Sequence, residues 1–196
     1  MDAVPLSPPS VAFTIAAVTA EDAEAYVRAH IEFLAHTYEP IAGAAFGDAR
    51  RAEFDQRIAH LHDDIAETTS ADAAGREPFR RHLIARDSRG DVMGVASAGL
   101  GAEEWEEPHL GERWFKASTD VVLSHLYTAS HTHGTGLGQA LLDAALPGRR
   151  PAYLWVYDEN RRAVRFYERN GFVRDGLCSD SGESWGSRPM SRMHRL

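Results

Sequence analysis

The first half of the chain places short apolar runs beside longer segments with helical periodicity. The run Ala12–Val18 is rich in strand-forming residues and predicts a strand. Apolar positions then recur at three- and four-residue spacing, which predicts helices from about Ala20–His36 and Ala49–Glu67. Pro40 and Gly43 are expected to break the first helix. The predicted buried stripes are Ala23, Val27, Ile31 and Leu34 in the first helix, and Phe54, Ile58, Leu61 and Ile65 in the second.

Strand patterns dominate the second half. Two runs separated by the turn composition Asp-Ser-Arg-Gly predict a hairpin, and later apolar runs predict further strands. This mixture indicates an α/β or α+β sheet with helices on its faces. The predicted strands are Arg81–Arg86, Asp91–Gly99, Asp120–Thr128, Ala152–Tyr157, Phe172–Leu177 and Arg188–Leu196. Two more helices are expected, one ending at Pro147 and one over Asp158–Asn170, with a loop at Thr68–Pro78 and a polar insertion at Gly101–Lys116.

Length and composition favour one domain, residues 11–196, after a short disordered leader, residues 1–10. The leader lacks the basic segment of a secretory signal, and no apolar run is long enough to span a membrane. A single cysteine, Cys178, excludes an intrachain disulfide and favours a cytoplasmic location. The net charge of −8 argues against a general nucleic-acid binder and is compatible with a cationic partner.

The segment His133–Gly138 carries the first candidate chemistry. It reads His-Gly-Thr-Gly-Leu-Gly between a predicted strand and an amphipathic helix whose apolar positions are Leu137, Ala140, Leu141, Ala144 and Ala145. Glycines without Cβ atoms allow backbone N–H groups to line a concavity, and the helix N-terminus adds a partial positive charge. The turn therefore suits a pyrophosphate, or it is a glycine-rich turn without a ligand. It lacks the third glycine of the dinucleotide fingerprint and the lysine of the nucleotide-triphosphate loop.

The last predicted helix carries a second pattern. Asn160, Ala163 and Tyr167 lie on one helical face, so an amide, a small residue and a phenol point the same way. Taken alone, such a tyrosine is typical of a core residue with its hydroxyl at the edge.

Together the two segments resemble the acyl-CoA-binding half of the GNAT superfamily of N-acetyltransferases. The family's turn reads Gln/Arg-x-x-Gly-x-Gly, and its later helix carries Asn-x-x-Ala-x-x-Phe/Leu-Tyr-x-x-x-Gly-Phe. Residues 160–172 match the second motif throughout, and residues 133–138 match the first except that His133 replaces Gln or Arg. The resemblance implies a mixed, largely antiparallel sheet of about seven strands flanked by about four helices.

By position, the resemblance also implies roles toward acetyl-CoA. The backbone of Leu126–Thr128 would pair with the pantetheine arm, the turn would hold the pyrophosphate, and Asn160 would bond the arm. Tyr167 would lie near the thioester sulfur and donate a hydrogen bond to the departing thiolate. The implied cosubstrate-binding set is Leu126, Tyr127, Thr128, His133, Gly134, Thr135, Gly136, Leu137, Gly138, Gln139, Asn160, Ala163 and Tyr167.

The general base is not assigned by the resemblance. Many relatives carry a glutamate early in the strand that precedes the turn, where this chain has Val122. Ser124 and His125 are candidate bases in that strand, and His36 and Tyr38 are expected near the acceptor side. His125, His131 and His133 also suggest a metal site, but they lack a nearby carboxylate or cysteine, and no metal is expected.

The reaction needs a neutral amine, a donor for the developing oxyanion and an acid for the leaving thiolate. An alkylammonium with a pKa near 10.4 is neutral only about one part in a thousand at pH 7. The leading hypothesis is acetyl transfer from acetyl-CoA to a primary amine of a small molecule, in a pocket roofed by the first two helices and the Gly101–Lys116 insertion. The alternatives are acetylation of a protein N-terminus or lysine, and a non-catalytic acyl-CoA-binding module. A homodimer paired along Arg188–Leu196 is a candidate assembly.

Overall fold

A seven-stranded sheet runs through residues 12–196, the part of the chain that the computed structural model describes. The predicted leader lies outside these residues. The strand order is β1-β2-β3-β4-β5-β7-β6, and every neighbouring pair is antiparallel except β4 and β5. The strands are β1 (Phe13–Ala17), β2 (Arg80–Asp87), β3 (Val92–Leu100), β4 (Val121–Thr128), β5 (Ala152–Tyr157), β6 (Val173–Asp180) and β7 (Pro189–Arg195). The predicted mixed, largely antiparallel sheet is confirmed.

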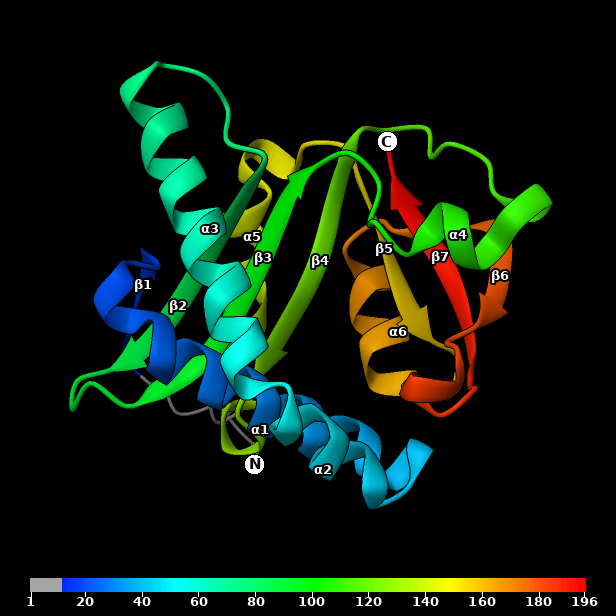
Figure 1. The fold of residues 1–196 in the computed structure, drawn as a ribbon, viewed down its shortest axis with the longest axis horizontal. Coiled ribbons are helices and arrows are strands. Elements are labelled where there is room, and N and C mark those ends of the chain that lie inside the picture. Colours follow the sequence, from blue (N-terminus) through cyan, green and yellow to red (C-terminus); the bar gives the residue numbers. More distant parts are fainter. Residues whose placement is uncertain (1–11) are drawn as a thin grey trace, which may run out of the picture.

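Helices cover both faces of this sheet (Figure 1). On one face α1 and α3 bury a cluster with Val95 of β3, and on the other α5 packs against Met93 and Ala96 of the same strand. Val95 and Ala96, which are neighbours along the strand, therefore enter opposite core layers. The helices are α1 (Ala23–Ala42), α2 (Ala45–Ala52), α3 (Phe54–Ala73), α4 (Glu106–Leu110), α5 (Leu137–Ala145) and α6 (Arg161–Arg169).

The helical region departs from its prediction in three places. Helix α1 continues through Pro40, because a proline in the last turn removes a single hydrogen bond and the Gly43 amide still donates to the Glu39 carbonyl at 2.9 Å. Helix α3 extends to Ala73, so the loop predicted from Thr68 begins later; the fully buried Ala71 holds this last turn against the body of the protein. The described chain has six α-helices instead of about four, since α2 is separate and α4 lies within the insertion.

The prediction that Arg188–Leu196 forms an edge strand for dimer pairing is wrong. The last strand, β7, lies between β5 and β6 and is hydrogen-bonded on both sides. A dimer cannot add a strand there, because the backbone groups of β7 already have partners. None of the helices in residues 12–196 is both long and apolar enough to cross a membrane.

Candidate active site

Strands β4 and β5 separate along their length. Their parallel pairing is confined to Val122 and Tyr153, and beyond that point the strands diverge (Figure 1). Residues Leu126–Thr128 pair only with β3, on their other side. The divergence leaves one edge of β4 without a strand partner in the middle of the sheet, where an extended ligand can bond to the backbone.

A β-bulge at Ser124 reverses the alternation of β4. His125 pairs with Ser97 while Leu123 pairs with Ala98, so one residue of β4 is left over. Beyond the bulge His125 and Tyr127 face the side covered by α1, and Leu126 enters the opposite core. Without the extra residue, the two aromatic side chains would share a face with Leu123. The bulge therefore turns two polar rings toward the cavity described below.

The glycine turn precedes α5 as predicted. Gly136 caps the helix with φ +92°, and a Cβ atom placed at Gly134 or Gly136 would meet nothing within 4 Å. The Thr135 amide is engaged with the Thr132 carbonyl at 3.2 Å. Within residues 12–196 the other amides of the turn donate no hydrogen bond; these are Gly134, Gly136, Leu137, Gly138 and Gln139. The turn thus presents free donors at a helix N-terminus, beside open space on which an anion can lie.

A cation that the sequence pattern did not single out stands beside this turn. Arg162, in the first turn of α6, donates to Nε2 of His133. Partial burial and then the charge of Arg162 lower the pKa of His133, so that histidine is neutral near pH 7. His36 also contributes to this shift; it lies outside the cavity wall, and its place near the acceptor side stays a prediction.

The predicted face of α6, with Asn160 and Tyr167, is present in the structure. Each of these two side chains also has a structural role. Asn160 caps the helix by accepting from the Ala163 amide at 3.2 Å, which leaves its NH₂ group for other contacts. Tyr167 is buried in the core against Phe172. Burial, and then the neighbouring Tyr38, raise the pKa of the Tyr167 phenol, which therefore keeps its proton through the working pH range.

A cavity of about 820 Å³ lies on the α1 face of the sheet, against β4. Its walls come from α1, α3, the Gly101–Lys116 insertion and the segment before β7. Val122 and Tyr38 both line it. Because Val122 stands at the position that the family resemblance pairs with a glutamate, this part of the wall is apolar. The charged residues of the wall are Asp63, Asp64, Glu103 and Glu104 against Arg57 and Arg80, and its tryptophans are Trp105, Trp155 and Trp185. Carboxylates and aromatic faces in excess favour a cationic ligand.

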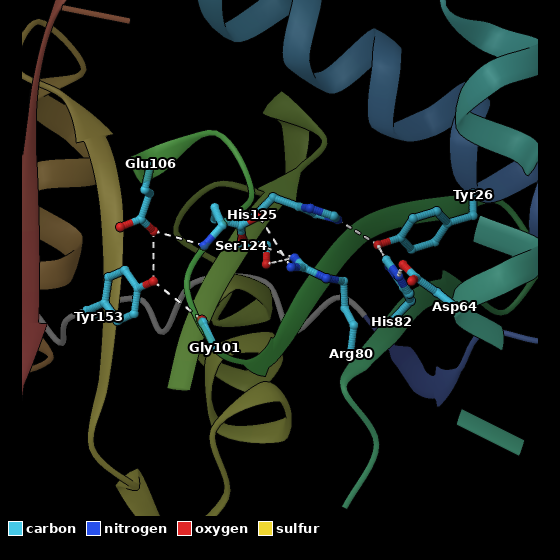
Figure 2. A network of polar contacts seen from close by, with 10 residues as sticks. Tyr26, Asp64, Arg80, His82, Gly101, Glu106, Ser124, His125 and Tyr153 are labelled. Atoms are coloured by element: carbon cyan, nitrogen blue, oxygen red, sulfur yellow. Dashed lines mark hydrogen bonds and ion pairs between the residues drawn. The ribbon is translucent and has the colours of Figure 1, made fainter. Parts of the chain in front are cut away.

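Arg80 of β2 ties the insertion to the cavity floor. Its guanidinium pairs with Glu103 at 3.0 Å and donates to the Ser124 hydroxyl (Figure 2). Because a cation already holds the Ser124 oxygen, that residue is a poor acceptor for a proton from an amine. Farther along the insertion, the buried Glu106 accepts from the Tyr153 hydroxyl at 2.7 Å. Part of the acidic run Glu103–Glu107 is therefore structural.

A chain of hydrogen bonds leads from His125 to the surface of α3 (Figure 2). The Tyr26 hydroxyl lies 2.7 Å from Nε2 of His125 and 3.2 Å from Nδ1 of His82. Nε2 of His82 lies 2.7 Å from Oδ2 of Asp64. His30 stacks on the His125 ring, with centroids 4.0 Å apart. Four elements, α1, α3, β2 and β4, meet in this network.

Acid is expected to destabilise the protein through His30. Burial, then Arg57 and His82, lower the pKa of this histidine to about 3, and its Nε2 has no partner among the described residues. The unfolded chain gains the proton near pH 6.5, and the folded one only near pH 3, so stability falls as pH drops between these values. From pH 7 to pH 5 we expect a loss of about 2 kcal/mol from His30 alone. Urea unfolding of wild type and His30→Phe at both pH values measures it; an equal pH dependence in the two proteins would contradict this assignment.

Sequence reasoning missed most of the cavity network. Tyr26 and His30 lie four residues apart on the apolar stripe of α1, and polar rings in such a stripe were a local signal that both point inward. For Asp64, Arg80 and His82 no local signal exists, because the fold alone brings them to His125. Nowhere in residues 12–196 do three or more metal-ligating side chains gather as they would around an ion.

Comparisons with known proteins agree with this architecture. Residues 78–174 match the family model of the acetyltransferase (GNAT) domain. A probable spermine N(1)-acetyltransferase of Bacillus subtilis subsp. natto is 30% identical over 100 residues, which are 48% of this chain and 60% of that protein. An uncharacterized N-acetyltransferase of Mycobacterium bovis is 40% identical over 62 residues, 29% of this chain and 40% of its own. The chain thus spans at most 60% of the length of these curated relatives.

Two solved structures share the fold over nearly the whole chain. The PaiA N-acetyltransferase of Thermoplasma acidophilum, in complex with coenzyme A, superposes with a TM-score of 0.65 at 19% identity, covering 94% of this chain and 98% of that one. A histone acetyltransferase HPA2 and related acetyltransferase of Corynebacterium glutamicum gives a TM-score of 0.58 at 24% identity, with coverages of 93% and 95%.

Proposed function

This chain belongs to the GNAT acetyltransferase superfamily, and on that premise we propose that it transfers an acetyl group from acetyl-CoA to a primary amine of a small cationic molecule. One observation carries the proposal. The free edge of β4 joins a turn of unpaired backbone amides at the start of α5 to a cavity walled by acidic and aromatic side chains.

The residues of the cleft fit acetyl-CoA. The free amides of Gly134 and of Gly136 to Gln139, with the guanidinium of Arg162, would hold the pyrophosphate. The backbone of Leu126–Thr128 would hold the pantetheine arm. The bound thioester supplies an activated acetyl group. Its carbonyl would lie against β4, where an unpaired N–H can stabilise the developing oxyanion. Tyr167 would donate to the sulfur as it gains charge.

A small amine suits the cavity better than a peptide does. Helices α1 and α3 and the insertion close it from several sides, whereas a peptide needs an open groove. Four carboxylates against two guanidinium groups would raise the local concentration of a polycation. The relative of Bacillus subtilis described as a spermine/spermidine N(1)-acetyltransferase, 29% identical over 100 residues, supports the same acceptor class.

Catalysis is proposed rather than mere binding because the cavity reaches His125 and Tyr127 on β4. A module that only holds acyl-CoA needs no acceptor space there. For the setting we propose the cytoplasm, since the chain's one cysteine, Cys178, is exposed and unpaired.

We expect spermidine to release free CoA thiol from acetyl-CoA at least about 100-fold faster than water does. A panel of polyamines, aminoglycosides, amino acids and short peptides is measured under the same conditions, with acetyl-CoA binding followed in parallel. Glutamate, whose two carboxylates the acidic wall repels, serves as the matched poor acceptor. Thiol release with peptides alone would contradict the small-molecule acceptor and favour a peptide substrate. No thiol release with any acceptor, in a sample that binds acetyl-CoA, would favour a non-catalytic module.

A further inference from the structure

The cavity offers a base where Val122 removes the usual one. His125 is the only imidazole on β4, and it stands one residue before the backbone expected to hold the pantetheine arm. The bulge at Ser124 turns its ring into the cavity. Its Nε2 is occupied by the Tyr26 hydroxyl, while Nδ1 has no partner among residues 12–196 and is not enclosed by protein. One ring nitrogen thus joins a hydrogen-bonded chain, and the other is left without a protein partner on a ring that lines the cavity.

That chain is continuous and ends at a partly exposed carboxylate. From Nε2 of His125 it passes through the Tyr26 hydroxyl, both ring nitrogens of His82 and Oδ2 of Asp64, with contacts of 2.7, 3.2 and 2.7 Å (Figure 2). The His82 side chain is 9% exposed, whereas that of Asp64 is 31% exposed on α3. The two histidines and Asp64 can accept a proton at one atom and release one at another, and the Tyr26 hydroxyl can do both at its oxygen.

We propose that His125 is the general base of the acetyl transfer and that Tyr26, His82 and Asp64 carry the proton from it to solvent. This inference rests on the proposed function. It assigns His125 as a catalytic residue, and Tyr26, His82 and Asp64 as positioning residues that act through it.

The proton balance closes along this route. The ammonium gives its first proton to Nδ1 of His125, and Nε2 releases its own to the Tyr26 oxygen. That hydroxyl passes its proton to Nδ1 of His82, and Nε2 of His82 passes one to Asp64. The neutral nitrogen then bonds to the acetyl carbon as the carbon–sulfur bond breaks. The second nitrogen proton ends on the CoA thiol, so one proton per turnover reaches water.

Burial, aided by nearby charges, keeps this base neutral between turnovers. Burial lowers the pKa of His125, and His30, His82, Arg80 and Arg57 lower it further. A neutral ring has a lone pair free at pH 7, and the positive charges of Arg80 and Arg57 favour return of the accepted proton along the chain. The Tyr26 hydroxyl also lies 3.2 Å from the Ala96 carbonyl, which accepts its proton when His82 does not. Because the Ala96 carbonyl is a second acceptor, the Tyr26 hydroxyl can rotate between catalytic cycles.

The test compares two acceptors that differ in basicity. Spermidine presents an ammonium with a pKa near 10 and needs a base, whereas an aminooxy analogue of the same length presents a nucleophile that is already neutral at pH 7. Tyr26→Phe keeps the ring and removes the relay hydroxyl. We expect kcat to fall at least about tenfold with spermidine and less than about twofold with the aminooxy analogue, with KM little changed for either.

Two further variants test the later links of the relay, and two control variants test for nonspecific effects on α3. His82→Gln and Asp64→Asn break the chain at later links and should show the same selective loss, partly recovered as pH rises. The matched controls, His62→Gln and Asp55→Asn, lie exposed on α3 outside the cavity wall and should behave as wild type. Equal losses with both acceptors, or none with spermidine, would overturn the relay. A wild type that binds acetyl-CoA but acetylates neither acceptor would overturn both the relay and the proposed function, a result distinct from either variant outcome.

Discussion

Replacing Tyr167 with phenylalanine is expected to lower kcat about 100-fold while the Kd for acetyl-CoA stays within about threefold. The ring packs in the core with Leu142 and Phe172, and phenylalanine retains those contacts. Only the hydroxyl is lost, and that group is proposed to stabilise the sulfur as the carbon–sulfur bond breaks. Because the interaction strengthens as charge develops, its loss affects turnover more than binding.

The raised pKa of Tyr167 makes hydrogen bonding, not early proton transfer, the expected role. An ordinary phenol is already about 1.5 pKa units above an ordinary thiol, so full transfer costs about 2 kcal/mol. Burial and Tyr38 raise the phenol's pKa further and increase that cost. The measurement is steady-state thiol release together with equilibrium acetyl-CoA binding on the same sample, with the melting temperature as a folding control. Unchanged kcat in a folded variant would remove Tyr167 from the mechanism.

Asp175→Asn is expected to lower the free energy of unfolding by about 3–5 kcal/mol. Arg192 of β7 is 0% exposed and its Nε lies 2.6 Å from Oδ2 of Asp175, whose side chain is 6% exposed. The guanidinium also donates to the Phe115 carbonyl at 2.8 Å, and it lies 4.5 Å from the centroid of the Phe115 ring. Removing the carboxylate charge leaves a buried cation without compensation. Because Phe115 belongs to the insertion, the same change should loosen one wall of the cavity.

Two companion variants distinguish this cause from general damage. Arg192→Met added to Asp175→Asn removes the uncompensated charge and should recover part of the loss. Asp120→Asn breaks the surface pair of Lys116 and Asp120, whose side chains are 72% and 66% exposed, and should change stability by less than about 0.5 kcal/mol. Urea unfolding of the four proteins at pH 7 measures these differences. Equal stability of Asp175→Asn and Asp120→Asn would show that the buried pair contributes little.

Local sequence accounts for most of the elements, and within the candidate site for the glycine turn and the predicted face of α6. The hairpin at β2 and β3, the buried strand β5 and the stripe on α1 follow from short-range periodicity, and the structure confirms them. The glycine turn was visible because its donors come from consecutive residues. The shared face of Asn160 and Tyr167 was visible because it follows from helical spacing, whereas the cap at Asn160 came from the structure. The helix break predicted at Pro40 was wrong, because the effect of a proline depends on its place within the helix, which composition does not reveal.

What the sequence by itself determined is therefore the make-up of contiguous segments: a glycine turn before a helix, an amide and a phenol on one helical face, and a valine at position 122. What only the tertiary structure decided is how distant polar groups meet. The bulge at Ser124 depends on the pairing of β4 with β3, and it alone turns His125 into the cavity. His82 and Asp64 reach that ring because β2 and α3 pack beside it. Buried polar groups need partners wherever the chain places them, and those partners are chosen by three-dimensional packing rather than by spacing along the sequence.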